Sequence, residues 1–366
     1  MFFKCSRPKT NSEVSPLFLA YGSEDIEMFR QLIDEGEIVN CLDINNCSLL
    51  SVIMSESIYK PGNKKFFDEL LKANVHLGVI GLEELPLSIA IKNLDDIYYM
   101  NALLEHNACP NSLKERPDER FVVKENPGIF MAIQKGDWDK INLLLEHDID
   151  LKISGKLSET VIMQLISNNS ENKLEIAEKL LPILIERGAN IEQQNDQKET
   201  SLHYFARYSN KNLMDLILTQ DPNIDHVSIL GKTPLIISCS WNNTEVAEAL
   251  INKGANILIK DNTGMTAAMY ISYFTNVKML NLLHEKGDDF SSCDLNGDNV
   301  FHHIAYKIIG LNNLRNNEFA DLFNKNKKLL FVENNEGKTP LKIIKSSDLK
   351  KYNEICKIIN IDEKSL

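Results

Sequence analysis

The stretch Gly231-Lys232-Thr233-Pro234-Leu235 decides the fold, because its pattern returns along the chain at a fixed interval. The copies Gly264-Met265-Thr266-Ala267-Ala268 and Gly297-Asp298-Asn299-Val300-Phe301 each begin 33 residues after the copy before them. A second marker with the same period runs in phase with the first, at residues 188–191, 221–224, 254–257 and 287–290. Two markers that share one period indicate a repeat architecture.

The residues between the markers predict two short helices in each repeat. Thr233 is a good N-cap, because its hydroxyl can accept a hydrogen bond from the first helical turn. Pro234 suits the first helical position, where its missing N–H has no consequence. Apolar residues recur at helical spacing over residues 246–251, and Gly254 follows as a helix stop. Asp261-Asn262-Thr263-Gly264 is a turn signal, so we expect a projecting hairpin before the next helix pair.

This unit resembles the ankyrin repeat family, whose repeat of about 33 residues opens with T-P-L-H-x-A, carries a leucine pair and closes with G-A-D/N. The segment from Thr233 to Ile257 is the copy that fits this pattern best. The resemblance implies an all-α solenoid of helix-turn-helix repeats with short β-hairpin connections.

Extending the frame in both directions predicts about ten repeats, which cover nearly the whole chain. We divide it into an N-terminal extension (1–14), degenerate N-terminal repeats (15–126), central repeats (127–338) and a C-terminal capping repeat (339–366). Some repeats exceed the unit length, which predicts inserted loops between paired helices at residues 55–63, 168–173 and 309–317. The charged connection over residues 110–126 is either an extended hairpin or a bend in the solenoid.

The composition is typical of a folded, water-soluble protein. With 43% hydrophobic and 25% charged residues, the chain can bury a substantial core. Its longest apolar stretches fall short of the roughly 20 residues that a bilayer span requires, so we expect no transmembrane segment. The first residues lack the apolar run of a secretory signal, which predicts a cytoplasmic protein.

Charge, cysteines and motifs argue against several functional classes. The net charge of −12 opposes binding to the phosphates of nucleic acid, so nucleic acid is not expected as a partner. The seven cysteines include no C-x-x-C pair, which favours reduced thiols over a zinc site. P-loop, nucleophile-elbow, H-E-x-x-H and kinase motifs are missing from the sequence. We therefore expect no catalytic residue, no metal and no cofactor.

The pair His302-His303 is the most obvious candidate for chemistry, yet its position favours a structural role. His302 and His203 occupy the histidine position of the T-P-L-H motif. The resemblance implies that such a ring bonds the backbone of the neighbouring hairpin. Trp138, at the start of a second helix, is expected to be packed.

The positions seven and eight residues after each capping residue predict a partner-binding surface. They should point outward from the first helix on the concave side, and they hold Arg207-Tyr208, Ser240-Trp241, Tyr273-Phe274 and Tyr306-Lys307. An exposed row of aromatic rings flanked by Arg and Lys is typical of interface hot spots. The alternative is that some rings fold down onto adjacent first helices. The equivalent residues in earlier repeats, Gln134-Lys135 and Ser167-Asn168, are polar.

The predicted function is protein binding, as a scaffold, adaptor or inhibitor without enzymatic activity. Degenerate repeats rich in Asn, Ile and Lys also resemble the ankyrin effectors that intracellular bacteria such as Legionella and Coxiella deliver into host cells by type IV secretion. This resemblance implies a host protein as partner and the host cytosol as location. A eukaryotic or viral ankyrin adaptor, and an enzyme with its site in the inserted loops, are the alternatives. The sequence leaves the partner and the oligomeric state open.

Overall fold

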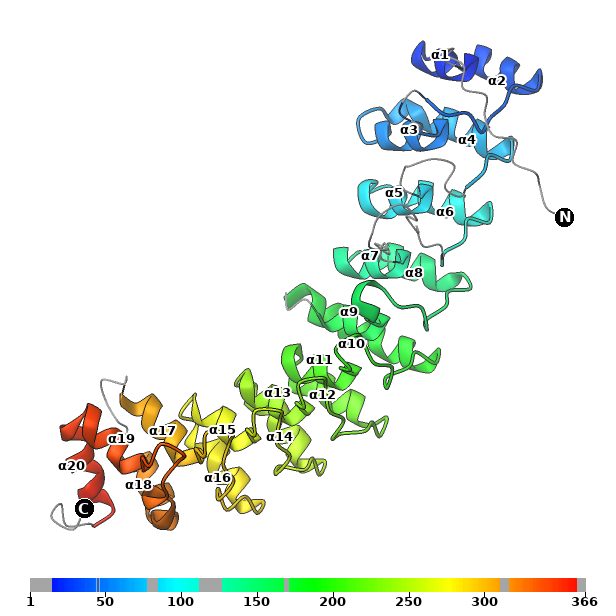
Figure 1. Ribbon diagram of the computed structural model, residues 1–366. Coiled ribbons are helices and arrows are strands. Elements are labelled where there is room, and N and C mark those ends of the chain that lie inside the picture. The colour runs from blue at the N-terminus through cyan, green and yellow to red at the C-terminus, as the bar shows by residue number, and fades with distance from the viewer. Residues whose placement is uncertain are drawn as a thin grey trace. The chain divides into compact units, whose positions relative to one another are not determined.

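The computed structural model describes residues 15–43, 45, 47–77, 85–111, 127–167, 171–309 and 316–360. These ranges contain twenty α-helices, three short 3-10 helices and no β-strand. The helices follow one another as ten pairs, each with a first and a second helix (Figure 1). The all-α architecture of helix pairs predicted from the sequence is confirmed.

The described residues form two compact units. One comprises residues up to Leu165 together with Arg187–Ala189, and the other comprises Ile166–Glu186 and the residues from Asn190 onward. The division between them lies inside the fifth repeat. The sequence predicts boundaries at residues 126 and 338, where degenerate repeats give way to regular ones and regular ones to the capping repeat. These boundaries stay a prediction.

In the first unit, the helices of neighbouring repeats pack in chain order: α3 contacts α5 and α5 contacts α7, while α2 contacts α4 and α6 contacts α8. The elements are α1 (Pro16–Gly22), α2 (Ile26–Asp34), α3 (Leu49–Glu56), η1 (Pro61–Asn63), α4 (Lys64–Lys72), α5 (Pro86–Asn93), α6 (Ile97–Glu105), α7 (Gly128–Lys135), α8 (Trp138–Glu146), η2 (Lys156–Ser158) and α9 (Val161–Ile166), which ends at the boundary.

In the second unit, the first helices α11, α13, α15, α17 and α19 form one continuous packed row, and α16, α18 and α20 pack in a second row. The elements are α10 (Glu171–Glu186), α11 (Ser201–Tyr208), α12 (Lys211–Leu218), α13 (Pro234–Ser240), α14 (Thr244–Asn252), α15 (Ala267–Ser272), α16 (Val277–Glu285), α17 (Val300–Ile309), α18 (Asn316–Lys325), η3 (Lys327–Phe331), α19 (Pro340–Ser347) and α20 (Leu349–Ile358).

Each pair buries the apolar face that the helical spacing predicts. Leu250 is fully buried on α14, and Ile251 beside it is 4% exposed. On the facing first helix, Leu235 is also fully buried. The register inferred for the second helix of the most regular repeat is therefore correct.

The helix starts follow from the capping residues. The Thr233 hydroxyl accepts a hydrogen bond from the Ile236 N–H at 3.2 Å, with Pro234 at the first helical position. Thr339 caps α19 in the same way through the Lys342 N–H at 3.1 Å. These side chains satisfy N–H groups that have no partner inside the helix. The expected starts of α13 and α19 are thus fixed locally.

The connections between repeats are tight turns without strands, in contrast to the expected short β-hairpins. Asp261 N–H donates to the Met265 carbonyl at 3.0 Å, which closes the turn. The Asp261 carboxylate then accepts from the N–H groups of Thr263 at 2.8 Å and Met265 at 3.1 Å. Because the side chain takes the N–H groups that a ladder would use, no strand pair forms in the described connections. The only bridge in these residues is an isolated one between Leu42 and Ser48.

The inserted loops lie partly within the described residues. Between α3 and α4, residues 57–63 form a turn and the short helix η1, so the extra length over 55–63 lies between paired helices as predicted. The insertions over 168–173 and 309–317 fall mainly on residues 168–170 and 310–315, outside the described ranges. The same holds for most of the 110–126 connection and for the extension 1–14.

Candidate protein-binding surface

The predicted aromatic residues come from the C-terminal ends of four successive first helices. Tyr208 is the last residue of α11, Trp241 and Tyr273 are the C-caps of α13 and α15, and Tyr306 lies in the last turn of α17. These helices follow one another in the second unit (Figure 1). Because each helix begins at an equivalent capping residue, offsets of seven and eight residues bring the rings to neighbouring positions at the ends of these helices. We call this set, with Phe274, the aromatic row.

Most rings of the row are exposed. Trp241 is 59% exposed, Tyr306 45%, Phe274 44% and Tyr273 40%. A packed core ring would be almost fully buried, so these side chains are not part of the core. Tyr208 is half-buried, as are Arg207 and Ser240, whereas Lys307 is exposed.

At one end of the row, rings and charges contact each other across a repeat boundary. The rings of Tyr208 and Trp241 have centroids 6.1 Å apart and are tilted by 54°. The Arg207 guanidinium lies 5.5 Å from the centre of the Tyr208 ring and 2.6 Å from Glu199 Oε1. The side chains at this end of the row are therefore held by contacts with one another, and the positive charge of Arg207 is already paired with Glu199.

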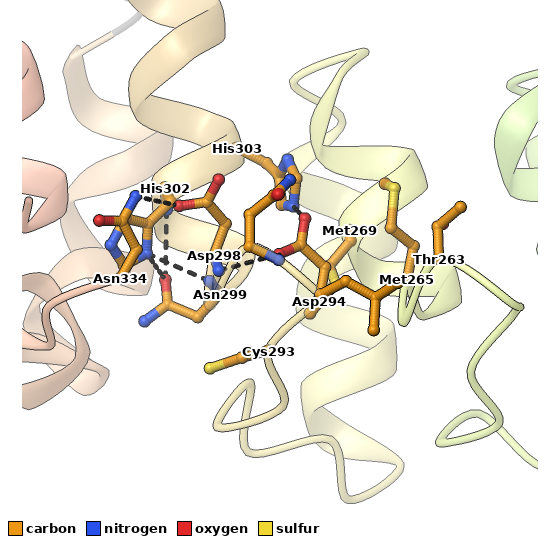
Figure 2. A network of polar contacts seen from close by, with 12 residues as sticks. Thr263, Met265, Met269, Cys293, Asp294, Asp298, Asn299, His302, His303 and Asn334 are labelled. Carbon is orange, nitrogen blue, oxygen red and sulfur yellow. Dashed lines mark hydrogen bonds and ion pairs between the residues drawn. The ribbon is translucent and has the colours of Figure 1, made fainter. Parts of the chain in front are cut away.

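At the other end, Tyr273 contacts a buried histidine. Its hydroxyl oxygen lies 3.1 Å from Nδ1 of His303. Nε2 of His303 lies 3.3 Å from Oδ2 of Asp294 (Figure 2). Burial lowers the pKa of His303, although Asp294 acts in the opposite direction. The imidazole is therefore neutral near pH 7, and the carboxylate favours the tautomer with its proton on Nε2.

Two carboxylates lie beneath this end of the row. Asp294 accepts from the N–H groups of Asn296 at 2.8 Å and Asp298 at 2.9 Å. Asp298 accepts from the Asn334 side-chain amide at 2.7 Å (Figure 2). The Asp294 side chain and the Asp298 residue are each 5% exposed. Their contacts in the described residues are with N–H groups, an amide and a neutral imidazole, so none of the described cations contacts either carboxylate.

His302 and His203 have the structural role predicted for them. Nε2 of His302 lies 3.1 Å from the Lys338 carbonyl oxygen, and Nε2 of His203 lies 3.1 Å from that of Lys232. Each ring thus bonds the backbone of the next connection, and Nδ1 of each accepts from the N–H of its own capping residue at 3.1 Å. Trp138, at the start of α8, is half-buried.

Sequence reasoning missed a group of apolar side chains at the turns of the second unit. Ile229 is 50% exposed, Leu230 60% and Leu295 70%. The sequence does contain a signal for these residues. Ile229 and Leu230 occupy the positions that the polar residues Asn262 and Thr263 occupy in the regular turn 33 residues later. Exposed apolar side chains at protruding turns extend the surface available to a partner.

Other kinds of site find less support in the described residues. The first unit has shallow depressions of about 340 and 450 Å³, lined mainly by the loops that follow second helices. Within the described ranges, no group of three or more His, Cys, Asp and Glu residues is arranged to hold a metal ion. No helix in the same ranges has both the length and the apolar character needed to cross a bilayer.

Comparisons with known proteins agree with the helix-pair architecture. Residues 162–261 match the family model for ankyrin repeats, in three copies. An ankyrin repeat protein of Variola virus is 22% identical over 246 residues, which cover 65% of this chain and 41% of that protein. A protein of Acanthamoeba polyphaga mimivirus named for its ankyrin repeats is 25% identical over 305 residues, or 80% of this chain and 70% of that protein.

A third relative is the ankyrin repeat and KH domain-containing protein mask-1 of Caenorhabditis elegans. It is 24% identical over 277 residues, which cover 75% of this chain and 10% of that protein. The chain thus spans 41% of the Variola virus protein and a tenth of mask-1. The feature common to the chain and these relatives is the ankyrin repeat.

Proposed function

Because the chain carries ankyrin repeats, we propose that it is a protein-binding module without enzymatic activity, acting as a scaffold, adaptor or inhibitor. The aromatic row is its proposed binding surface, with Arg207, Ser240 and Lys307 at its margin. The observation that carries this proposal is the 59% exposure of Trp241, which lies next to Tyr208 of the preceding repeat. Large exposed rings in a contiguous set are characteristic of interface hot spots.

The energetic argument rests on the surface that a partner would cover. Burying about 100 Å² of one ring at about 25 cal/mol per Å² contributes about 2.5 kcal/mol. The rings are attached to helices that are packed into the core, with Ile237 on α13 and Ile271 on α15 both buried. The backbone of the surface is therefore already ordered, which lowers the entropy cost of binding.

Two settings are proposed for this function. The degenerate repeats rich in Asn, Ile and Lys support an effector of an intracellular bacterium, delivered by type IV secretion and acting on a host protein in the host cytosol. The relatives described above are viral and animal proteins, which supports a viral or eukaryotic adaptor instead. The enzyme alternative places its site in inserted loops, and two of these lie mainly outside the described residues.

The experiment that tests the proposal is a comparative affinity capture from host-cell lysate, followed by mass spectrometry. The baits are the unaltered chain, Trp241→Ala, Tyr208→Ala and the control Gln134→Ala, whose residue is exposed in the first unit. We expect a protein that the unaltered and Gln134→Ala chains retain and that the two aromatic variants lose. Equal recovery on all four folded baits would refute the aromatic row as the binding surface.

A further inference from the structure

We propose that the end of the aromatic row formed by Tyr273, Phe274 and Tyr306 receives a cationic side chain, Arg or Lys, of the protein partner. This inference rests on the proposed function and specifies the chemistry of the partner. It depends on two observations that are independent of each other. The first is the negative charge near the rings, and the second is that none of the described Lys and Arg residues lies over them.

The first observation is the uncompensated charge of Asp294 and Asp298. Both carboxylates are almost completely buried, and their contacts are with backbone N–H groups, the Asn334 amide and the neutral imidazole of His303. Solvent and salt screen a buried charge less than an exposed one. Glu199, in contrast, pairs with a cation, because Arg207 Nη2 lies 2.6 Å from its Oε1.

The charge of these carboxylates acts on the rings in question. Burial raises the pKa of the Tyr273 hydroxyl, and Asp294 and Asp298 raise it further. Tyr306 has its pKa raised by burial first, and then by Asp298 and Glu336, with Lys338 opposing. Lys338 lies 2.7 Å from Glu336 Oε2, so its own charge is paired. Both phenols are therefore neutral rings in a negative environment.

The second observation concerns cation–π contacts within the chain. The Arg207 guanidinium lies 5.5 Å from the centre of the Tyr208 ring, and the Lys232 ammonium lies 4.5 Å from that of Tyr270. Among the residues that the structure describes, no Lys or Arg lies in this way over the rings of Tyr273, Phe274 or Tyr306. A cation thus lies over the Tyr208 ring at one end of the row, and none of the described Lys and Arg residues does so at the other. The Tyr273 ring contacts the His303 ring at a centroid distance of 5.3 Å, so the rings of Phe274 and Tyr306 offer the more accessible faces.

The negative net charge of the whole chain, −12, acts in the same direction, because it favours the approach of a basic partner over an acidic one. Lys307 is the exposed cation that follows Tyr306 in the sequence, and it opposes the proposed binding. This opposition provides a test, since removal of Lys307 should strengthen the binding of a cation.

The probes are three capped peptides, Ac-Leu-Arg-Gly-Arg-Leu-NH₂ and its counterparts with both Arg residues replaced by Gln or by Glu. The chain has two tryptophans, so Trp138→Phe leaves Trp241 as the sole fluorescent reporter on the row. Binding is followed by this fluorescence at low and at physiological ionic strength. We expect the Arg peptide to bind about 5-fold or more tightly than the Gln peptide, and the Glu peptide to bind most weakly.

Variants of the chain separate charge from ring contact. Asp294→Asn and Asp298→Asn should each lower the affinity for the Arg peptide about 2- to 5-fold and leave the affinity for the Gln peptide unchanged. Lys307→Gln should raise the affinity for the Arg peptide. Tyr306→Phe should retain the preference for Arg, because the ring face remains, and Tyr306→Leu should lose it. Glu248→Gln, at an exposed position on α14, is the control and should change nothing. Melting temperatures confirm that each variant is folded.

The outcomes distinguish this inference from the proposed function. Equal binding of the three peptides, or a preference for Glu, would overturn the cation inference. If a captured protein is nevertheless lost with Trp241→Ala, the proposed function stands and only its charge chemistry is wrong. If capture is also unaffected by the aromatic variants, both are wrong.

Discussion

The ammonium group of Lys140 lies 2.7 Å from the carbonyl oxygen of Leu94, one repeat earlier in the chain. It also donates to the Ile91 carbonyl at 3.2 Å and lies 3.2 Å from Asp137, the N-cap of α8. The residue is 1% exposed. A lysine three residues after an aspartate cap thus donates hydrogen bonds to carbonyl groups at the end of α5, the first helix of the preceding repeat. These carbonyl groups have no partner within α5.

The second unit contains the same arrangement. Lys351 donates to the carbonyls of Ile308 at 2.8 Å and Ile309 at 3.2 Å, and lies 3.2 Å from its cap Asp348. Its recurrence in both units indicates a device that joins neighbouring repeats. Asp-x-x-Lys in a sequence is usually a surface pair, and only the packing of repeats reveals the buried bonds.

We expect Lys140→Met to destabilise the first unit by about 3 kcal/mol or more, because the change leaves buried carbonyls and the Asp137 carboxylate without their partner. Urea unfolding of the variant measures this loss. Lys135→Met is the control, since Lys135 is exposed on α7 and its replacement should stay within about 0.5 kcal/mol. Similar losses for the two variants would contradict the role of the buried amine.

Leu250→Ala should cost about 2–5 kcal/mol, through lost burial and the cavity that remains. Leu250 is fully buried on α14, whereas Glu248 on the same helix is exposed. Glu248→Ala is therefore the matched control, with little expected change. Chemical denaturation followed by circular dichroism gives both values, and a cost under about 0.5 kcal/mol for Leu250→Ala would show that the assigned register is wrong.

Gly231→Ala tests the contact between successive turns. Gly231 has φ +73°, and a Cβ there would lie 2.4 Å from Asn262 Oδ1 and 2.8 Å from Asn262 N. Asn262 N–H donates to the Leu230 carbonyl at 3.1 Å, so the next turn lies directly against this glycine. Gly337 occupies the equivalent position in the last repeat with φ +71°, and its Cβ would meet nothing within 4 Å.

Both Gly→Ala changes carry the cost of a positive φ, about 1 kcal/mol. Only Gly231→Ala also displaces a neighbouring turn, so its melting temperature should fall further than that of Gly337→Ala. Equal melting temperatures would mean that the turns contribute no packing of their own.

Much of the fold could be predicted because its signals are local and periodic. Thr233 and Pro234 start their helix through contacts within one turn, and the spacing of Leu250 follows from one helix face. The contacts that join Tyr273 to His303 and His303 to Asp294 could not be predicted in this way, because Tyr273 and His303 come from different repeats. Whether they meet depends on the stagger between stacked helices, which the 33-residue period does not specify.

The stability of the second unit should fall between pH 7 and pH 5. Burial lowers the pKa of His203 to about 4, from an ordinary value of 6.5. The unfolded chain therefore binds this proton more readily than the folded chain does, so stability is complete above pH 6.5 and decreases as the pH falls toward 4. The full effect for this group is on the order of 3 kcal/mol.

The measurement is the unfolding free energy at several pH values between 5 and 7, where carboxylates contribute little. His203→Gln removes the titrating group and should flatten this dependence, even if it lowers stability at pH 7. If the unfolding free energy of this variant changes with pH as steeply as before, His203 is not the source of the dependence. His302 and His303 would then be the candidates, because burial lowers their pKa values too.

Trp241→Ala separates partner binding from packing. Because Trp241 is 59% exposed and its ring contact is with Tyr208 at 6.1 Å, its removal should cost at most about 1 kcal/mol of stability. Removal of a core tryptophan would cost about 3–5 kcal/mol. Affinity for the partner should instead fall by about 1–4 kcal/mol, and by more than for Tyr208→Ala, since Tyr208 is half-buried. Melting temperature and affinity are measured on the same preparations, with Gln134→Ala as the control away from the row. A large loss of stability with unchanged affinity would reject the aromatic row and direct attention to the exposed turn residues Ile229 and Leu230.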